Sequence, residues 1–133
     1  MAVLIDTDML VGLERGAASR EVDAAIGDED RAISVISVRE PLRGVYRATD
    51  APRVRRRAFV EHVLAGMRAI EITERVARVH ADLWAQLAAA GQLIGAHDLW
   101  IAATASAHGM GVATGNAGEF QRVPGLRVIT LGA

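Results

Sequence analysis

Residues 3–8 have the sequence Val-Leu-Ile-Asp-Thr-Asp, a short apolar run that ends in an acidic residue. A run of this kind predicts a buried strand, and Asp6 follows it directly. Three further segments, 33–40, 94–104 and 112–120, also place an acid or a carboxamide beside an apolar run. Because ligands bind at the C-terminal edge of the strands in open α/β sheets, these polar side chains are expected to meet at that edge.

Predicted strands and helices alternate along the chain. Apolar runs predict strands at 1–5, 32–35, 69–72, 111–114 and 126–131. Capping residues and helical spacing predict helices that begin near Thr7 or Asp8, Ala18, Ser37, Pro52, Thr73 and Asp98, and a short turn or helix at 116–120. This alternation favours an α/β fold with a parallel sheet, and 133 residues fit one domain that spans residues 1–133.

The composition excludes several classes of protein. Hydrophobic residues make up 51% of the chain and aromatic residues only 4%, which predicts an aliphatic core. No apolar run approaches the roughly 20 residues of a membrane helix, and the start lacks the features of a signal peptide. The chain has no cysteine, which excludes disulfides and thiolate metal sites. Together these features favour a cytoplasmic protein that does not enter the membrane.

The positive charge is unevenly distributed along the chain. The net charge is −1, and all 15 basic residues are arginine. Seven of these arginines lie between residues 39 and 57, just after an acidic stretch at 28–30. Arginine suits phosphate contact through its planar donor fork, so this run is either a solvated helix face or a nucleic-acid surface. Arg39 and Arg43 are the candidate RNA-binding residues.

The polar side chains at the expected sheet edge are oxygen donors. Asp6, Glu40 and Asp98 supply carboxylates, and Asn116 and Glu119 follow the strand at 111–114. A cluster of oxygen ligands suits a hard divalent cation such as Mg²⁺ or Mn²⁺. The simplest chemistry for such a cluster is metal-assisted hydrolysis of a phosphodiester bond.

Each of these residues also has a local structural explanation. Asp6 could cap the following helix, and Asp98 could be the N-cap of the apolar helix that starts there. Glu40 could complete a capping box with Ser37, and Asn116 has the same three-residue spacing to Glu119. Both explanations remain open for each residue, since a capping residue can also bind a ligand.

Two threonines are candidates for a supporting role around the acids. Thr7 follows Asp6, and Thr114 ends the strand at 111–114. Their hydroxyls could hydrogen-bond the metal-binding carboxylates, although Ser and Thr in such turns usually bond to the local backbone.

The order of the four segments and their flanking residues is more specific than any one acid. Leu-Ile-Asp-Thr-Asp at 4–8 is followed by Ser-Val-Ile-Ser-Val-Arg-Glu at 34–40. Ile-Gly-Ala-His-Asp-Leu-Trp-Ile-Ala-Ala-Thr at 94–104 precedes Thr-Gly-Asn at 114–116 and Glu-Phe at 119–120. Over essentially its whole length the chain resembles the PIN-domain family, and within it the VapC-type toxins of bacterial toxin–antitoxin pairs.

The resemblance implies a three-layer α/β/α domain and an endoribonuclease that depends on Mg²⁺ or Mn²⁺. The family's first three acids correspond to Asp6, Glu40 and Asp98, and its fourth acidic region to Asn116 and Glu119. The chain departs from the usual pattern at Asn116, where Asp is common. It also departs on both sides of Glu40, where Ala and Leu are more usual than Arg and Pro.

The resemblance also implies partners. These are a VapB-type antitoxin that covers the active-site groove, an RNA substrate, a second copy of the chain in a homodimer, and operator DNA reached only through the antitoxin. The alternative is a PIN fold of weak catalytic power that serves as an RNA-binding or scaffold module. A small-molecule phosphatase of the haloacid-dehalogenase type is disfavoured, because those enzymes use a lysine and this chain has none.

Overall fold

A five-stranded parallel sheet forms the centre of the molecule, in the order β3-β2-β1-β4-β5. The computed structural model describes residues 2–6, 9 and 19–130. The strands are β1 (Ala2–Ile5), β2 (Asp30–Ser34), β3 (Arg68–Ile70), β4 (Gly111–Thr114) and β5 (Val128–Thr130). The predicted α/β class is therefore confirmed, and β1 lies at the centre of the sheet.

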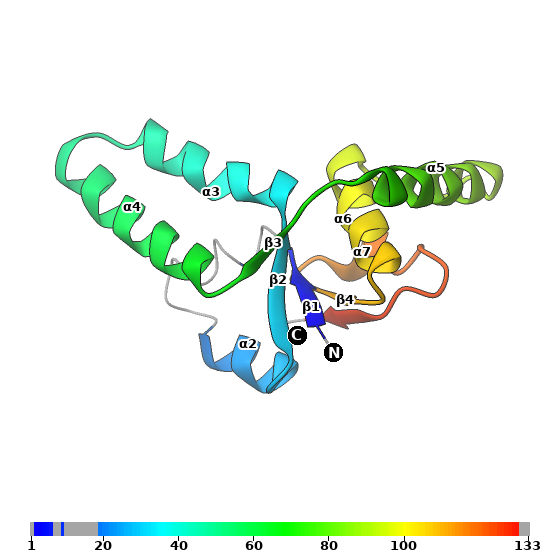
Figure 1. Cartoon of the computed structure of the whole chain (residues 1–133), viewed down its shortest axis with the longest axis horizontal. Helices are drawn as coiled ribbons and strands as arrows, with labels where there is room; N and C mark the ends of the chain where they lie inside the picture. The colour runs from blue at the N-terminus through cyan, green and yellow to red at the C-terminus, as the bar shows by residue number, and fades with distance from the viewer. Residues whose placement is uncertain (1, 7–8, 10–18, 131–133) are drawn as a thin grey trace.

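Helices connect the strands and pack on both faces of the sheet. They are α2 (Ser19–Ile26), α3 (Val35–Arg47), α4 (Asp50–Ala65), α5 (Glu74–Ala89), α6 (Ala96–Ala107) and α7 (Ala117–Phe120). Figure 1 shows α3 and α4 as a hairpin that extends from one side of the sheet, while α5 and α6 lie on the other side. None of the described helices has both the length and the apolar character needed to span a membrane.

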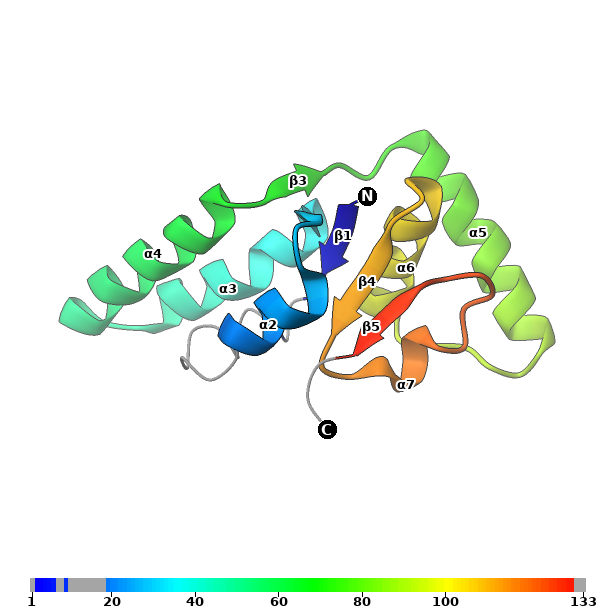
Figure 2. The same ribbon diagram turned by 90° about the horizontal axis from the view of Figure 1, so that it is seen from below.

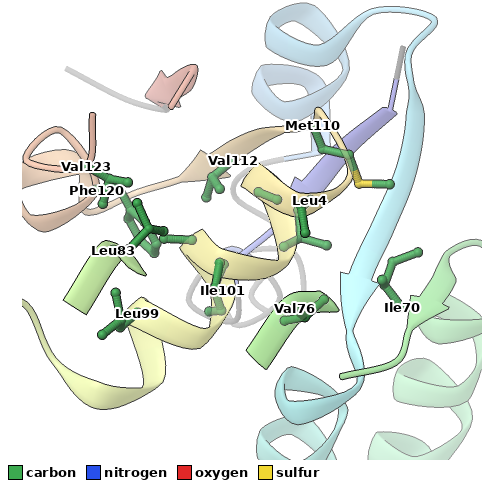
Figure 3. Close-up of a cluster of buried hydrophobic side chains, with 14 of the residues drawn as sticks. Leu4, Ile70, Val76, Leu83, Leu99, Ile101, Met110, Val112, Phe120 and Val123 are labelled. Carbon is green, nitrogen blue, oxygen red and sulfur yellow. The ribbon is translucent and has the colours of Figure 1, made fainter. Parts of the chain in front are cut away.

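One face of the sheet packs against α5 and α6. The side chains of Leu4, Ala32 and Val112 point to this face from three adjacent strands. They join buried residues of the two helices and the C-terminal segment in one cluster, much of which is visible in Figure 3. The helical members include Val76, Leu83, Leu87, Leu99 and Ile101. As predicted, this core is almost entirely aliphatic, with Phe120 as its aromatic member.

The opposite face of the sheet packs against α2 and the hairpin. Val3, Ile5 and Ile33 alternate with the residues of the first face, as the period of two along a strand requires. They contact Ile26 of α2 and partly buried residues at the base of the hairpin: Val38, Val63 and Leu64. A parallel sheet that is buried on both faces is the usual arrangement in α/β proteins, and it gives the three layers.

The start of α3 differs from the sequence prediction. Ser34, in extended conformation, is the N-cap, and its side chain accepts a hydrogen bond of 3.4 Å from the Ile36 N–H. Ser37 therefore lies inside the helix, and the predicted capping box between Ser37 and Glu40 is wrong. The physical reason is that Ser34 ends β2 one turn earlier and supplies the same capping chemistry. Pro41 consequently lies within the helix and not in its first turn.

Other differences are smaller. The strand β3 ends at Ile70 instead of residue 72, and α4 begins at Asp50, ahead of Pro52. Trp84 is 52% exposed and lies off the apolar face of α5, whereas its neighbour Leu83 is buried. The helix predicted to start near Thr7 or Asp8 lies outside the described residues, apart from Met9, which is buried.

Arginine side chains hold the outer end of the α3–α4 hairpin. Arg53 donates hydrogen bonds of 2.7 Å to the Ala48 carbonyl and 3.2 Å to the Tyr46 carbonyl. Arg56 donates a hydrogen bond of 3.2 Å to the Gly44 carbonyl. These carbonyls lie in the last turn of α3 and at its C-cap, where most acceptors lack an intrahelical donor. Part of the arginine-rich run therefore has a structural role within the hairpin.

Candidate active site

Asp6 stands at the carboxyl end of the central strand. Its N–H donates a hydrogen bond of 2.9 Å to the Ala113 carbonyl, which continues the pairing of β1 with β4. Its carboxylate Oδ2 accepts a hydrogen bond of 2.8 Å from the Thr114 hydroxyl. Thr114 in turn accepts a hydrogen bond of 3.0 Å from the Asn116 N–H. The Asp6 side chain is thus held in a defined orientation, and the residue is only 6% exposed.

Asp98 and Glu119 form a pair of hydrogen-bonded carboxyl groups. Asp98 lies in the first turn of α6, and Glu119 lies in α7. The Glu119 Oε1 also accepts a hydrogen bond of 3.2 Å from the Gly95 N–H at the start of α6. The pair therefore joins two of the predicted site residues.

The neighbours of Glu119 lower its pKa. The hydrogen bond from Asp98 is the largest influence on Glu119 and lowers its pKa, which outweighs the opposing effect of desolvation. The Gly95 N–H and the positive charge of Arg122 lower the pKa of Glu119 further. These contacts favour the charged form of Glu119.

Glu40 is engaged by two arginines of its own helix. The Arg39 Nη2 lies 3.0 Å and the Arg43 Nη1 lies 3.4 Å from the same Glu40 Oε1. Desolvation acts to raise the pKa of Glu40, but the hydrogen bonds and charges of Arg39 and Arg43 hold it below its usual value. The candidate RNA-binding arginines are therefore both in contact with one of the candidate metal ligands.

The fold brings these groups to one region without closing them into a single cluster. Asp6 and Thr114 end adjacent strands, and α6, which carries Asp98, packs against both β1 and α3. Within residues 2–6, 9 and 19–130, no three His, Asp or Glu side chains are close enough together to hold a metal ion. Asp6 is hydrogen-bonded to Thr114, and Asp98 is hydrogen-bonded to Glu119. Glu40 forms ion pairs with Arg39 and Arg43.

The capping alternatives are wrong for two of the candidates. Gly95 is the N-cap of α6, so Asp98 lies inside the helix and does not cap it. Asn116 precedes α7 as its N-cap, but its side chain makes no capping hydrogen bond to that helix. Neither side chain caps a helix, and that of Asp98 is hydrogen-bonded to Glu119. Thr7 lies outside the described residues, and its predicted role stays a prediction.

Sequence reasoning missed Ser37 as a feature of this region. The residue is 0% exposed, and its Oγ has no hydrogen-bond partner among the described residues. Its treatment as a helix cap concealed it. Recognition that Ser34 could cap the helix equally well would have placed Ser37 one turn inside, on the same helix face as Glu40.

Comparisons with known proteins agree with this fold. A family model described as PIN domain matches residues 3–126. Ribonuclease VapC1 of Rickettsia felis is 36% identical to this chain over an alignment that covers 98% of this chain and 97% of that protein.

Solved structures show the same fold. VapBC2 from Rickettsia felis, bound to a DNA fragment from its promoter, contains a chain that superposes with a TM-score of 0.85 at 22% identity, with 98% of each chain covered. VapBC-5 from Mycobacterium tuberculosis matches with a TM-score of 0.77 at 28% identity, covering 98% of this chain and 99% of that chain. The family model and the shared architecture define a PIN-domain protein, and the chain belongs to this family. Within it, the relative at 36% identity places the chain among the VapC ribonucleases.

Proposed function

We propose that this chain is the toxic component of a toxin–antitoxin pair, an endoribonuclease that hydrolyses phosphodiester bonds in RNA with the help of Mg²⁺ or Mn²⁺. The observation that carries the proposal is the setting of Asp6. A carboxylate that is 6% exposed, held by Thr114 at the carboxyl end of the central strand, is placed where α/β folds bind their ligands. The VapC ribonucleases among its relatives support the RNA substrate.

The donor set fits a hard divalent cation. Asp6, Glu40 and Asp98 offer only oxygen atoms, which Mg²⁺ and Mn²⁺ prefer. These three residues would hold the cation, with Asn116 and Glu119 beside them. When bound, the cation supplies a lowered pKa for an attacking water and stabilises negative charge on the phosphate.

Glu119 would support Asp98 at the site. The two side chains are hydrogen-bonded, and Glu119 is anchored by the Gly95 N–H. Thr114 donates a hydrogen bond to the carboxylate of Asp6 and would orient it in the same way.

Arginines around the site would contact the RNA backbone. Arg39 and Arg43 lie beside Glu40, so a phosphate that approaches Glu40 also approaches two guanidinium groups. Their planar donor forks suit phosphate oxygens. Arg53 and Arg56 are less suited to this role, because they already bind backbone carbonyls at the end of α3.

The partners follow from the same proposal. A VapB-type antitoxin would cover the site and inhibit it, and the pair would bind operator DNA through the antitoxin. Two copies of the chain would form a homodimer. Cellular RNA as the substrate makes the cytoplasm the place of action.

Cleavage of RNA by the purified protein tests the proposal. Total RNA is incubated with wild-type protein and Mg²⁺, Mn²⁺ or EDTA, beside Asp6→Asn and the exposed control Glu61→Gln. Discrete cuts that need the metal, persist in Glu61→Gln and are lost in Asp6→Asn would support an endoribonuclease. No cleavage by folded, antitoxin-free wild type would favour the scaffold or RNA-binding alternative, to which the pairing of Glu40 with arginines already lends some support.

A further inference from the structure

Ser37 combines complete burial with an unused hydroxyl. The residue is 0% exposed, so bulk water cannot reach it, and its Oγ has no hydrogen-bond partner among the described residues. Buried polar atoms in proteins are nearly always hydrogen-bonded, because an unsatisfied one destabilises the fold. No other described side chain has a buried nitrogen or oxygen in this condition. The hydroxyl therefore calls for an explanation.

The backbone at Ser37 is also short of a donor. In an α-helix the Ser37 carbonyl accepts from the N–H four residues later, and that residue is Pro41. Proline has no N–H, so this hydrogen bond cannot form. One buried residue thus carries a free hydroxyl and a carbonyl that lacks its usual donor.

Ser37 lies between two of the candidate metal ligands. The pairing of Leu4 with Ala32, continued by two residues, places Asp6 beside Ser34 at the ends of β1 and β2. Ser37 follows one helical turn after Ser34, and Glu40 one turn after Ser37, on the same face of α3. The helix α3 also packs against α6, which carries Asp98.

We propose that Ser37 is a positioning residue of the metal site, whose hydroxyl becomes accessible to a water of the hydration shell, and hydrogen-bonds it, when Mg²⁺ or Mn²⁺ binds between Asp6 and Glu40. This inference rests on the proposed function and adds a residue to it. Mg²⁺ usually keeps several of its waters when it binds to a protein, and these waters need hydrogen-bond partners. Removal of such outer partners typically weakens metal binding by 10- to 100-fold.

Binding of Mn²⁺ to Ser37→Ala tests the proposal without any need for activity. Mn²⁺ affinity is measured by titration calorimetry and by electron paramagnetic resonance, and stability by urea unfolding in EDTA. Ser37→Ala is expected to bind Mn²⁺ about tenfold more weakly. In EDTA it should be at least as stable as wild type, because the change removes an unsatisfied buried polar atom.

Two further variants make the result specific. Ser37→Thr keeps the hydroxyl and should restore most of the Mn²⁺ affinity. Ser106→Ala makes the same change at an exposed position near the far end of α6 and should leave the affinity unchanged.

The failures can be told apart. Equal Mn²⁺ affinity in wild type and Ser37→Ala, with Asp6→Asn unable to bind, would overturn this inference and leave the proposed function standing. A marked loss of stability of Ser37→Ala in EDTA would also overturn it, because the hydroxyl would then have a partner without metal. Failure of wild type to bind Mn²⁺ or Mg²⁺ would overturn the inference and the metal-dependent function together.

Discussion

Thr114 donates a hydrogen bond of 2.8 Å to the carboxylate of Asp6, and so joins two residues 108 positions apart in the sequence. The Thr114 oxygen also accepts from the Asn116 N–H, at 3.0 Å. A hydroxyl has a single proton, so this arrangement directs that proton to Asp6. The ends of β1 and β4, which lie side by side in Figure 2, are tied together at the site by this bond.

Loss of the Thr114 hydroxyl should destabilise the protein. We expect Thr114→Val to lower the free energy of unfolding by about 1–2 kcal/mol, because the buried carboxylate of Asp6 loses its donor. Urea unfolding at pH 7 measures the change. Thr114→Ser keeps the hydroxyl and should lose less stability. Equal stability of Thr114→Val and wild type would show that the bond contributes nothing to the fold.

Release of Glu40 from its arginine should strengthen metal binding. Arg39→Ala removes a positive charge and the 3.0 Å hydrogen bond to Glu40, so we expect Mn²⁺ to bind about threefold more tightly. The same change should weaken RNA binding. Calorimetric titration measures the first effect and filter binding of RNA the second. Arg75→Ala, an exposed arginine on α5, is the control and should change neither. Weaker Mn²⁺ binding by Arg39→Ala would contradict the expectation.

Glu29 should make the stability depend on pH. The hydrogen bond from Arg127 is the main cause that holds the pKa of Glu29 below its ordinary 4.5. A carboxyl group whose pKa is lowered by folding stabilises the protein above its unfolded pKa, and this stabilisation is lost as the pH falls below that value. The free energy of unfolding of Glu29→Gln, measured from pH 7 to pH 3, should therefore fall less steeply than that of wild type.

The partner arginine provides a second test of the same ion pair. Arg127→Gln removes this pair and should reduce the fall of stability with pH in the same way as Glu29→Gln. The same steep fall in Glu29→Gln as in wild type would mean that the Glu29–Arg127 ion pair does not act in solution.

Phe120 should be the most costly aromatic residue to remove. It is 0% exposed and packs in the cluster formed with α5 and α6. Phe120→Ala should lower the free energy of unfolding by about 3–5 kcal/mol, through lost burial and a cavity. Val54→Ala, at a site that is 70% exposed, should change it by no more than about 0.5 kcal/mol. Denaturant unfolding of both variants measures these changes in the free energy of unfolding.

The sequence was most informative where a short apolar run had a single possible role. Residues 3–5 and 112–113 could only be buried strands, and the acid or threonine after each was therefore placed correctly at the sheet edge. The start of α3 was predicted less accurately, because two serines could each supply a helix cap. Ser34 and Ser37 are three positions apart and serine at either position can cap a helix, so only the length of β2 decides between them.

The contacts among the site residues could not be predicted from the sequence. The pairing of Glu40 with Arg39 and Arg43 depends on side-chain conformations along α3. The pairing of Asp98 with Glu119 depends on how α7 packs against the start of α6. Both are long-range or rotamer-dependent outcomes, whereas periodicity reports only which face of an element is buried.

The α3–α4 hairpin buries few of its side chains, among them Val45 and Val60, and arginine-to-carbonyl bonds hold its outer end. By contrast, most of α6 is buried. Segments with few buried contacts open locally at low free energy, while the centre of a sheet opens only on global unfolding. The turn between the two helices, where Thr49 is exposed, is therefore the expected first cut in limited proteolysis. Such a cut would separate the two helices of the hairpin while the sheet and the Asp98–Glu119 pair stay intact.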